Sequence, residues 1–119
     1  MKLLIAGSRT IKDFDLSPYI TDDVDTILTG GAKGIDTIAE QYAKEHGLDL
    51  VVIKPQYDLY GKGAPIVRNK TLAENCDMAL IIWDGTSKGT KFTADYVQKL
   101  GKPLSVVTLT SNEINPPKA

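Results

Sequence analysis

One segment, residues 26–36, constrains the fold of this chain more than any other. It begins with the apolar pair Ile27 and Leu28, which predicts a short buried strand. Three glycines follow at the carboxyl end of that strand: Gly30, Gly31 and Gly34. Apolar residues spaced three and four apart then predict a helix that ends near His46. A strand, a glycine-rich loop and a helix in this order are typical of an anion site in an open parallel sheet, although the same glycines also suit a plain tight turn.

The composition indicates one globular domain. The chain has 119 residues, of which 42% are hydrophobic and 24% charged, which is enough for one ordinary core. The formal net charge of −1 supplies no basic field for nucleic acid or an anionic membrane. No apolar run reaches the roughly 18 residues of a membrane-spanning helix, and the run before Gly7 is too short for a signal peptide. We therefore expect a cytoplasmic protein without a membrane partner.

Two residue types that often carry chemistry each occur once. Cys76 is the single cysteine, so an internal disulfide is excluded. His46 is the single histidine, so the chain has neither a histidine cluster for zinc nor a Ser/His/Asp triad. We predict neither a metal site nor a cofactor.

The remaining chain alternates between strand and helix patterns. Besides 27–28, apolar runs predict strands at 3–6, 50–53, 78–83 and 104–107. Further helices are predicted at about 65–76 and up to Leu100. The alternation predicts an α/β fold, a three-layer sandwich whose five-stranded parallel sheet has the order 3-2-1-4-5 and helices on both faces. We expect one domain over residues 1–109 and a flexible tail over 110–119, which holds two prolines and no periodicity.

Two more loops at strand ends resemble the first in composition. Residues 7–10 combine Gly7, two hydroxyls including that of Ser8, and Arg9, whose guanidinium can clamp a phosphate or carboxylate. Residues 84–90 combine two glycines, three hydroxyls and a lysine. In the predicted order, the three glycine loops follow neighbouring strands and meet at one crevice. This convergence predicts a site for a small anionic ligand.

The segment between the third strand and the third helix adds further candidates. Tyr57 and Tyr60 can stack on a flat ligand or pack this long loop onto the body of the protein. Helical spacing predicts a buried stripe on the third helix that includes Ile66. Asn69 falls within this stripe, where its amide needs a partner in the protein or in a ligand. Arg68 is expected off that stripe, in a first turn where its charge opposes the helix dipole, and this indicates an anionic partner.

The predicted ligand-binding residues come from these four segments. They are Gly7, Ser8, Arg9, Gly30, Gly31, Lys33, Gly34, Asp36, Tyr60, Arg68, Asn69, Asp84, Gly85, Ser87, Lys88, Gly89 and Thr90.

As a set, these segments resemble a known family. They read Gly-Ser-Arg at 7–9, Thr-Gly-Gly-Ala-Lys-Gly-Ile-Asp at 29–36, Tyr-Gly at 60–61 with Arg-Asn at 68–69, and Trp-Asp-Gly-Thr-Ser-Lys-Gly-Thr at 83–90. Over roughly residues 2–107 the chain is similar to the YspA/YpsA-related branch of the SLOG superfamily. That superfamily also contains the Lonely Guy phosphoribohydrolases, the DNA-processing protein A fold and nucleotide-sensing domains of antiphage systems. The resemblance implies a Rossmann-like domain that binds a nucleotide or a nucleotide derivative and forms a homodimer or a larger homo-oligomer.

One departure from the Lonely Guy enzymes leaves the activity open. Those enzymes carry glutamates just after the Gly-Thr pair of the loop that follows the fourth strand, whereas here residues 91–93 are Lys, Phe and Thr. Hydrolysis of an N-glycosidic bond needs a carboxylate. Asp84 or Asp36 can supply it, with Arg68 matched to the helix arginine of those enzymes, but Asp36 can instead cap its own helix.

Three functions therefore remain. The first is a binding domain that senses a nucleotide, and the second is a nucleoside-monophosphate N-glycosidase that uses the catalytic candidates Asp84, Asp36 and Arg68. The third is a single-strand nucleic-acid binder, against which the net charge and the lack of a basic stripe count.

Overall fold

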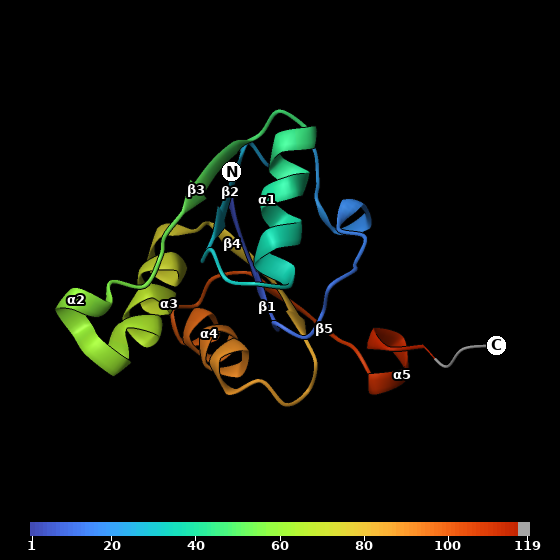
Figure 1. The fold of residues 1–119 in the computed structure, drawn as a ribbon. Helices are drawn as coiled ribbons and strands as arrows, with labels where there is room; N and C mark the ends of the chain where they lie inside the picture. Colours follow the sequence, from blue (N-terminus) through green and yellow to red (C-terminus); the bar gives the residue numbers. More distant parts are fainter. Residues whose placement is uncertain (117–119) are drawn as a thin grey trace.

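The computed structural model describes residues 1–116 and contains one five-stranded sheet (Figure 1). Its strands are β1 (Lys2–Gly7), β2 (Thr26–Thr29), β3 (Asp49–Val52), β4 (Met78–Trp83) and β5 (Leu104–Thr108). All pairings are parallel, and the order is β3-β2-β1-β4-β5. The predicted sheet and strand order are confirmed.

Three long helices cover the two faces of this sheet. They are α1 (Ile35–Glu45), α3 (Ala64–Asn75) and α4 (Lys88–Lys99). The short elements are η1 (Ser17–Tyr19), α2 (Tyr57–Tyr60), η2 (Gly61–Gly63) and α5 (Ser111–Ile114). Within residues 1–116 the longest helices have 12 residues, which is too few to cross the apolar part of a bilayer.

The core is divided by the sheet because successive strand residues point to opposite faces. On one face, Leu3 and Ile5 of β1 pack with Ile35 and Ala39 of α1. On the other face, Leu4 of β1 packs with residues of α3 and α4. These central residues are fully buried, as expected for strands covered on both sides. The helices are thereby fixed against the sheet, and their amino ends are held at its carboxyl edge.

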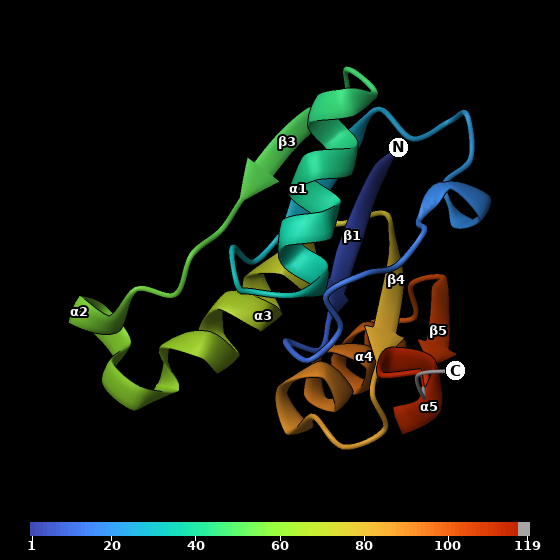
Figure 2. The same ribbon diagram turned by 45° about the vertical axis from the view of Figure 1, so that its right-hand side comes forward.

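The two edges of the sheet carry different short elements (Figures 1 and 2). Helix α2 and η2 lie beyond the end of β3, in the segment 54–64 that the sequence indicates as a long loop. Helix α5 lies beside β5 at the opposite edge.

The prediction of a flexible tail over 110–119 did not anticipate α5. Thr110 accepts a hydrogen bond from the Glu113 N–H at 3.2 Å, and the Glu113 carboxylate accepts one from the Thr110 N–H at 2.9 Å. This capping box gives the helical turn a local stabilisation that does not depend on apolar periodicity. Ile114 also packs against the core. Residues 117–119 of the expected tail lie outside the described residues, and a domain boundary at residue 109 stays a prediction.

The predicted buried face of α3 is wrong in its first turns. Ile66, expected inside, is 47% exposed, whereas Arg68, expected outside, is 8% exposed. Ala64, Leu72 and Ala73 share the buried side with Arg68. The reason is that the Arg68 side chain packs onto the loop after β2, where a guanidinium finds a backbone carbonyl, rather than onto the apolar sheet.

Candidate ligand-binding cleft

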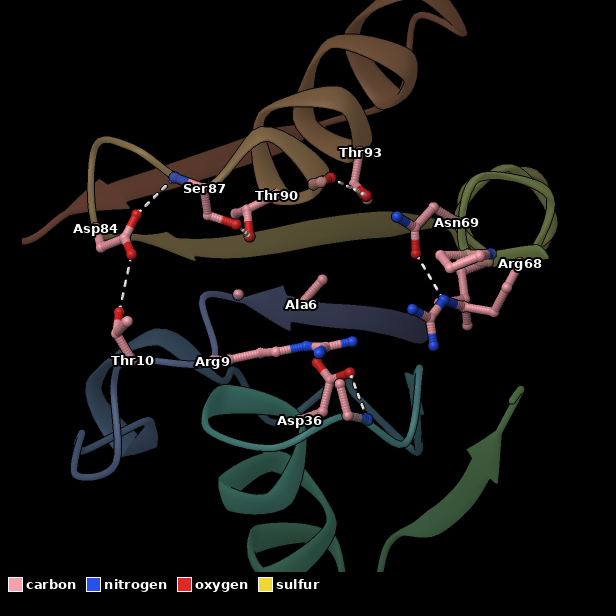
Figure 3. A pocket seen from close by; sticks show the side chains of 15 residues that line it. Ala6, Arg9, Thr10, Asp36, Arg68, Asn69, Asp84, Ser87, Thr90 and Thr93 are labelled. Atoms are coloured by element: carbon pink, nitrogen blue, oxygen red, sulfur yellow. Dashed lines mark hydrogen bonds between the residues drawn. The ribbon is translucent and has the colours of Figure 1, made fainter. Parts of the chain in front are cut away.

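A cleft of about 440 Å³ lies at the carboxyl ends of the central strands (Figure 3). It is lined by the loops after β1, β2 and β4 and by the first turns of α3 and α4. It therefore lies where ligands bind in open α/β sheets.

The cleft brings together about half of the residues predicted to bind a ligand. Those that line it are Gly7, Arg9, Asp36, Arg68, Asn69, Asp84, Ser87, Gly89 and Thr90. The others lie outside its lining: Ser8, Gly30, Gly31, Lys33, Gly34, Tyr60, Gly85 and Lys88. Lys33, Lys88 and Gly85 are exposed, and Tyr60 lines a different cavity.

Several residues outside the lining hold the loops together. Ser8 is fully buried, and its hydroxyl accepts a hydrogen bond from the Asp84 N–H at 3.0 Å, which joins the loops after β1 and β4. Gly34 has φ +78°, and a Cβ there would lie 2.5 Å from the Ser8 carbonyl oxygen. The second loop therefore approaches the first so closely that only glycine fits.

Arg68 is the more buried of the two arginines in the cleft wall. Its Nη1 donates to the Gly30 carbonyl, and its Nε donates to Asn69 Oδ1 at 2.7 Å. Burial lowers the pKa of the Arg68 guanidinium, the Asp36 carboxylate acts in the opposite direction, and the group stays charged. Asn69 thus has a partner in the protein and orients the guanidinium.

Asp36 lies in the first turn of α1 and is 5% exposed. It flanks the same glycine as Arg68, because a Cβ on Gly30 would lie 3.0 Å from Asp36 Oδ2 and 2.6 Å from Arg68 Nη1. Its Oδ2 accepts a hydrogen bond from the Ala32 N–H at 3.1 Å, so it braces the glycine loop, and it forms no side-chain N-cap bond. Its Oδ1 has no hydrogen-bond partner within residues 1–116. Burial raises the pKa of Asp36, against the effect of the Ala32 N–H.

Asp84 is held differently, by donors from two loops. Its Oδ1 accepts from the N–H groups of Thr86 at 2.9 Å and Ser87 at 2.8 Å, and its Oδ2 accepts from the Thr10 hydroxyl at 2.8 Å. Burial opposes the shift, but these hydrogen bonds together lower the pKa of Asp84 to about 2. The carboxylate therefore stays ionised at neutral pH and acts as a brace for the loop after β4.

The amino end of α4 faces the cleft with little negative charge of its own. Ser87 is the N-cap residue but makes no side-chain cap bond, and the first turn holds no acidic residue. The Ser87 and Thr90 hydroxyls lie 3.0 Å apart (Figure 3). The first N–H groups of a helix, with the positive end of its dipole, favour an anion.

The cleft walls combine two guanidiniums with two carboxylates. Figure 3 shows the Arg9 side chain extended across the cleft. Neither Arg9 nor Arg68 forms an ion pair in the described part of the chain, where the ion pairs are Met1–Asp25 and Lys91–Asp95. Residues 1–116 also hold no group of three acidic, histidine or cysteine side chains that could bind a metal.

Sequence reasoning missed several lining residues. They are Ala6, Thr10, Ala32, Pro65, Leu72 and Thr93. Thr93 follows Thr90 by three positions on α4, so helical periodicity from the predicted Thr90 is the signal that finds it. Thr10 belongs to the loop 7–10, and its hydrogen bond to Asp84 holds it at the cleft.

Fold and site together define a Rossmann-like α/β domain with a ligand-sized cleft at its carboxyl edge. The chain belongs to the YspA, cpYpsA-related SLOG family, because the family model, YAcAr, matches residues 1–60. The matched part contains the loops after β1 and β2, whereas Arg68 and the loop after β4 lie beyond it. Comparison with curated proteins and with solved structures gave no match.

Proposed function

We propose that the cleft binds a phosphate-bearing nucleotide or nucleotide derivative and that the domain senses this ligand. One observation carries the proposal. Arg68 is 8% exposed, lines the cleft and has no ion-pair partner among residues 1–116. Buried charges in proteins are normally paired, because an isolated charge costs several kcal/mol to desolvate. Asp36 acts on the pKa of Arg68 but forms no ion pair with it, so an anionic ligand supplies the direct partner.

The donors around the cleft fit a phosphate group. Arg68 uses two of its N–H groups on Gly30 and Asn69, and a guanidinium has five. Arg9 lines the same cleft, and the amino end of α4 contributes Gly89 and Thr90. Two guanidiniums and a helix amino end are the groups that proteins use for phosphate. The family is compatible with a nucleotide-related ligand.

A thermal-shift screen of mononucleotides, dinucleotides and cyclic nucleotides tests the proposal. A ligand that binds only the folded state raises stability by RT ln(1 + [L]/Kd), which is about 2.7 kcal/mol at a hundred times Kd. We expect at least one nucleotide to raise the melting temperature, and the same nucleotide to lose this effect with the Arg68→Gln variant. No shift from any of them at millimolar concentration contradicts the proposal.

The second candidate function is hydrolysis of a nucleoside monophosphate at its N-glycosidic bond, and Asp36 favours it. This carboxyl lines the cleft and its pKa is raised by burial, which suits an acid–base group. Asp84 does not suit that role, because its oxygens are engaged and its pKa is low. Incubation with nucleoside monophosphates, followed by an assay for free base, separates the two functions. Base release that disappears with Asp36→Asn supports the enzyme.

A further inference from the structure

A second cavity lies beside the cleft, on the other side of Arg68. It has a volume of about 560 Å³ and lies between the end of β3 and helix α3. Arg68 lines both cavities. Its neighbours on α3 divide between them, with Pro65, Asn69 and Leu72 on the cleft and Ala64, Val67 and Thr71 on the second cavity. The two cavities therefore flank α3, with the guanidinium at their junction.

The loop after β2 separates the two cavities. Ala32 lines the cleft, whereas Gly31 packs against the wall of the second cavity. A Cβ on Gly31 would lie 3.0 Å from Val52 Cγ1 and 3.1 Å from Lys54 Cγ, and both of these residues line the second cavity. Arg68 and the loop after β2 therefore lie where the two cavities meet, and a ligand that extends past Arg68 reaches both.

The second cavity differs from the cleft in its chemistry. It holds Lys54 and Arg68, and no Asp or Glu is among its lining residues. Its apolar surface comes from side chains such as Pro55 and Val67, and the ring of Tyr60, which is 48% exposed, lines it. A flat aromatic ring stacks on tyrosine and on guanidinium faces, while the polar groups of lysine and threonine can bind the edge of such a ring.

We propose that the second cavity binds the nucleobase of the ligand whose phosphate is held in the cleft. The proposal rests on the proposed function, and it adds that both ends of a nucleotide are recognised. Tyr60 stacks on the base, and Arg68 lies between base and phosphate. Tyr57, on the same helical turn, is 56% exposed and lines neither cavity, so it takes no part.

Calorimetric titration of the full chain with two kinds of probe tests this assignment. The four ribonucleoside 5′-monophosphates carry a base, and ribose 5-phosphate carries the same sugar and phosphate without one. Removal of a stacking aromatic weakens a bound base by about five- to 150-fold. We expect Tyr60→Ala to weaken the tightest mononucleotide by that factor, to leave ribose 5-phosphate within about twofold, and Tyr60→Phe to bind as the wild type does.

The matched control is Leu59→Ala. Leu59 lies on the same helical turn, is 69% exposed and lines neither cavity, so this variant reports on damage to the turn itself. We expect it to bind both probes as the wild type does. Arg68→Gln is the variant that tests the phosphate site, and it should weaken both probes.

The possible failures are distinguishable. If the wild type binds mononucleotide and ribose 5-phosphate equally, or if Tyr60→Ala weakens both alike, the base assignment is overturned while the phosphate site stands. If the wild type binds none of these probes, the base assignment is overturned, whereas the proposed function is overturned only if the dinucleotides and cyclic nucleotides of the thermal-shift screen also fail to bind.

Discussion

The guanidinium of Arg68 lies directly against the backbone of Gly30, 38 residues earlier in the chain. Its Nη1 donates to the Gly30 carbonyl, and a Cβ on residue 30 would lie 2.6 Å from that nitrogen and 2.9 Å from Cζ. Gly30 is not among the glycines with positive φ in the described chain. Glycine at this position therefore provides the space that the Arg68 guanidinium occupies, and backbone freedom plays no part.

The first prediction is that Gly30→Ala displaces the Arg68 guanidinium and weakens the proposed ligand. Loss of a charge-assisted hydrogen bond corresponds to roughly a ten- to hundredfold change in affinity. Gly63→Ala is the control, because a Cβ at Gly63 meets nothing within 4 Å and its φ of −80° suits alanine. Titration with the nucleotide found in the thermal-shift screen measures both. Equal affinity for Gly30→Ala and wild type contradicts the role of this contact.

The second prediction compares Arg68, a buried basic residue of α3, with Lys33, an exposed basic residue of the loop after β2. Arg68→Lys should recover only part of the affinity that Arg68→Ala loses, because lysine cannot form the guanidinium fork. Lys33→Ala should leave affinity within about twofold, since Lys33 is exposed and does not line the cleft. Affinity per folded molecule is the quantity to compare, and a larger effect for Lys33 than for Arg68 refutes the site.

The third prediction concerns acid stability and Asp84. Its pKa falls from the ordinary 3.8 to about 2 in the folded protein, so the folded state binds this proton less readily than the unfolded state. The stabilisation is complete above pH 3.8 and is lost as the pH falls toward 2. Urea unfolding between those pH values should show a steeper loss of stability in wild type than in Asp84→Asn. Parallel curves contradict the prediction.

The fourth prediction concerns Asp36, whose pKa is raised by burial. A carboxyl whose pKa is higher in the folded state stabilises the fold at pH values below its unfolded-state pKa. This stabilisation is lost as the pH rises through the folded-state pKa. Asp36→Asn removes this titration, so its stability relative to wild type should increase as the pH is raised from 3.8 toward neutrality. Chemical unfolding of both proteins over this range measures the difference, and a difference that decreases with pH shows that the carboxylate is stabilised as an anion.

The fifth prediction concerns Lys102, which closes the carboxyl end of α3. Its Nζ donates to the carbonyls of Ala73, Glu74 and Cys76, each at 2.8 Å. Lys102→Met should lower the free energy of unfolding by about 1–3 kcal/mol, since the last carbonyls of the helix lose a cationic partner. Lys99→Met, at an exposed position, should change it by less than about 0.5 kcal/mol. Denaturant titration at neutral pH compares the two.

We also expect the homodimer that the sequence resemblance implies. Val106 on the edge strand β5 is 45% exposed, so this edge of the sheet is open to a second copy. Light scattering at micromolar concentration should give about twice the chain mass of 12.9 kDa. A monomer mass rules out the dimer.

The sequence by itself determined the fold and the place of the cleft. Apolar runs and helical periodicity indicate which residues face the core, and both can be recognised within a short segment of the sequence. Together with the rule for parallel crossovers they predicted the strand order and the meeting of three loops. Arg9, Asp36 and Ser87 were found in this way, because each lies in a loop at a strand end or in the first turn of the helix that follows such a loop.

Only the tertiary structure decided how individual side chains are used. Arg68 points inward because the loop after β2 offers it a carbonyl, and no pattern within α3 records that contact. Lys33 and Lys88 are exposed to solvent. Ser8 and Asp84 instead form a hydrogen bond that joins the loops after β1 and β4. The spacing of apolar residues along the chain predicts where helices and strands form. The direction and charge state of a polar side chain depend on neighbours that are distant in sequence, and these become defined only when the elements pack.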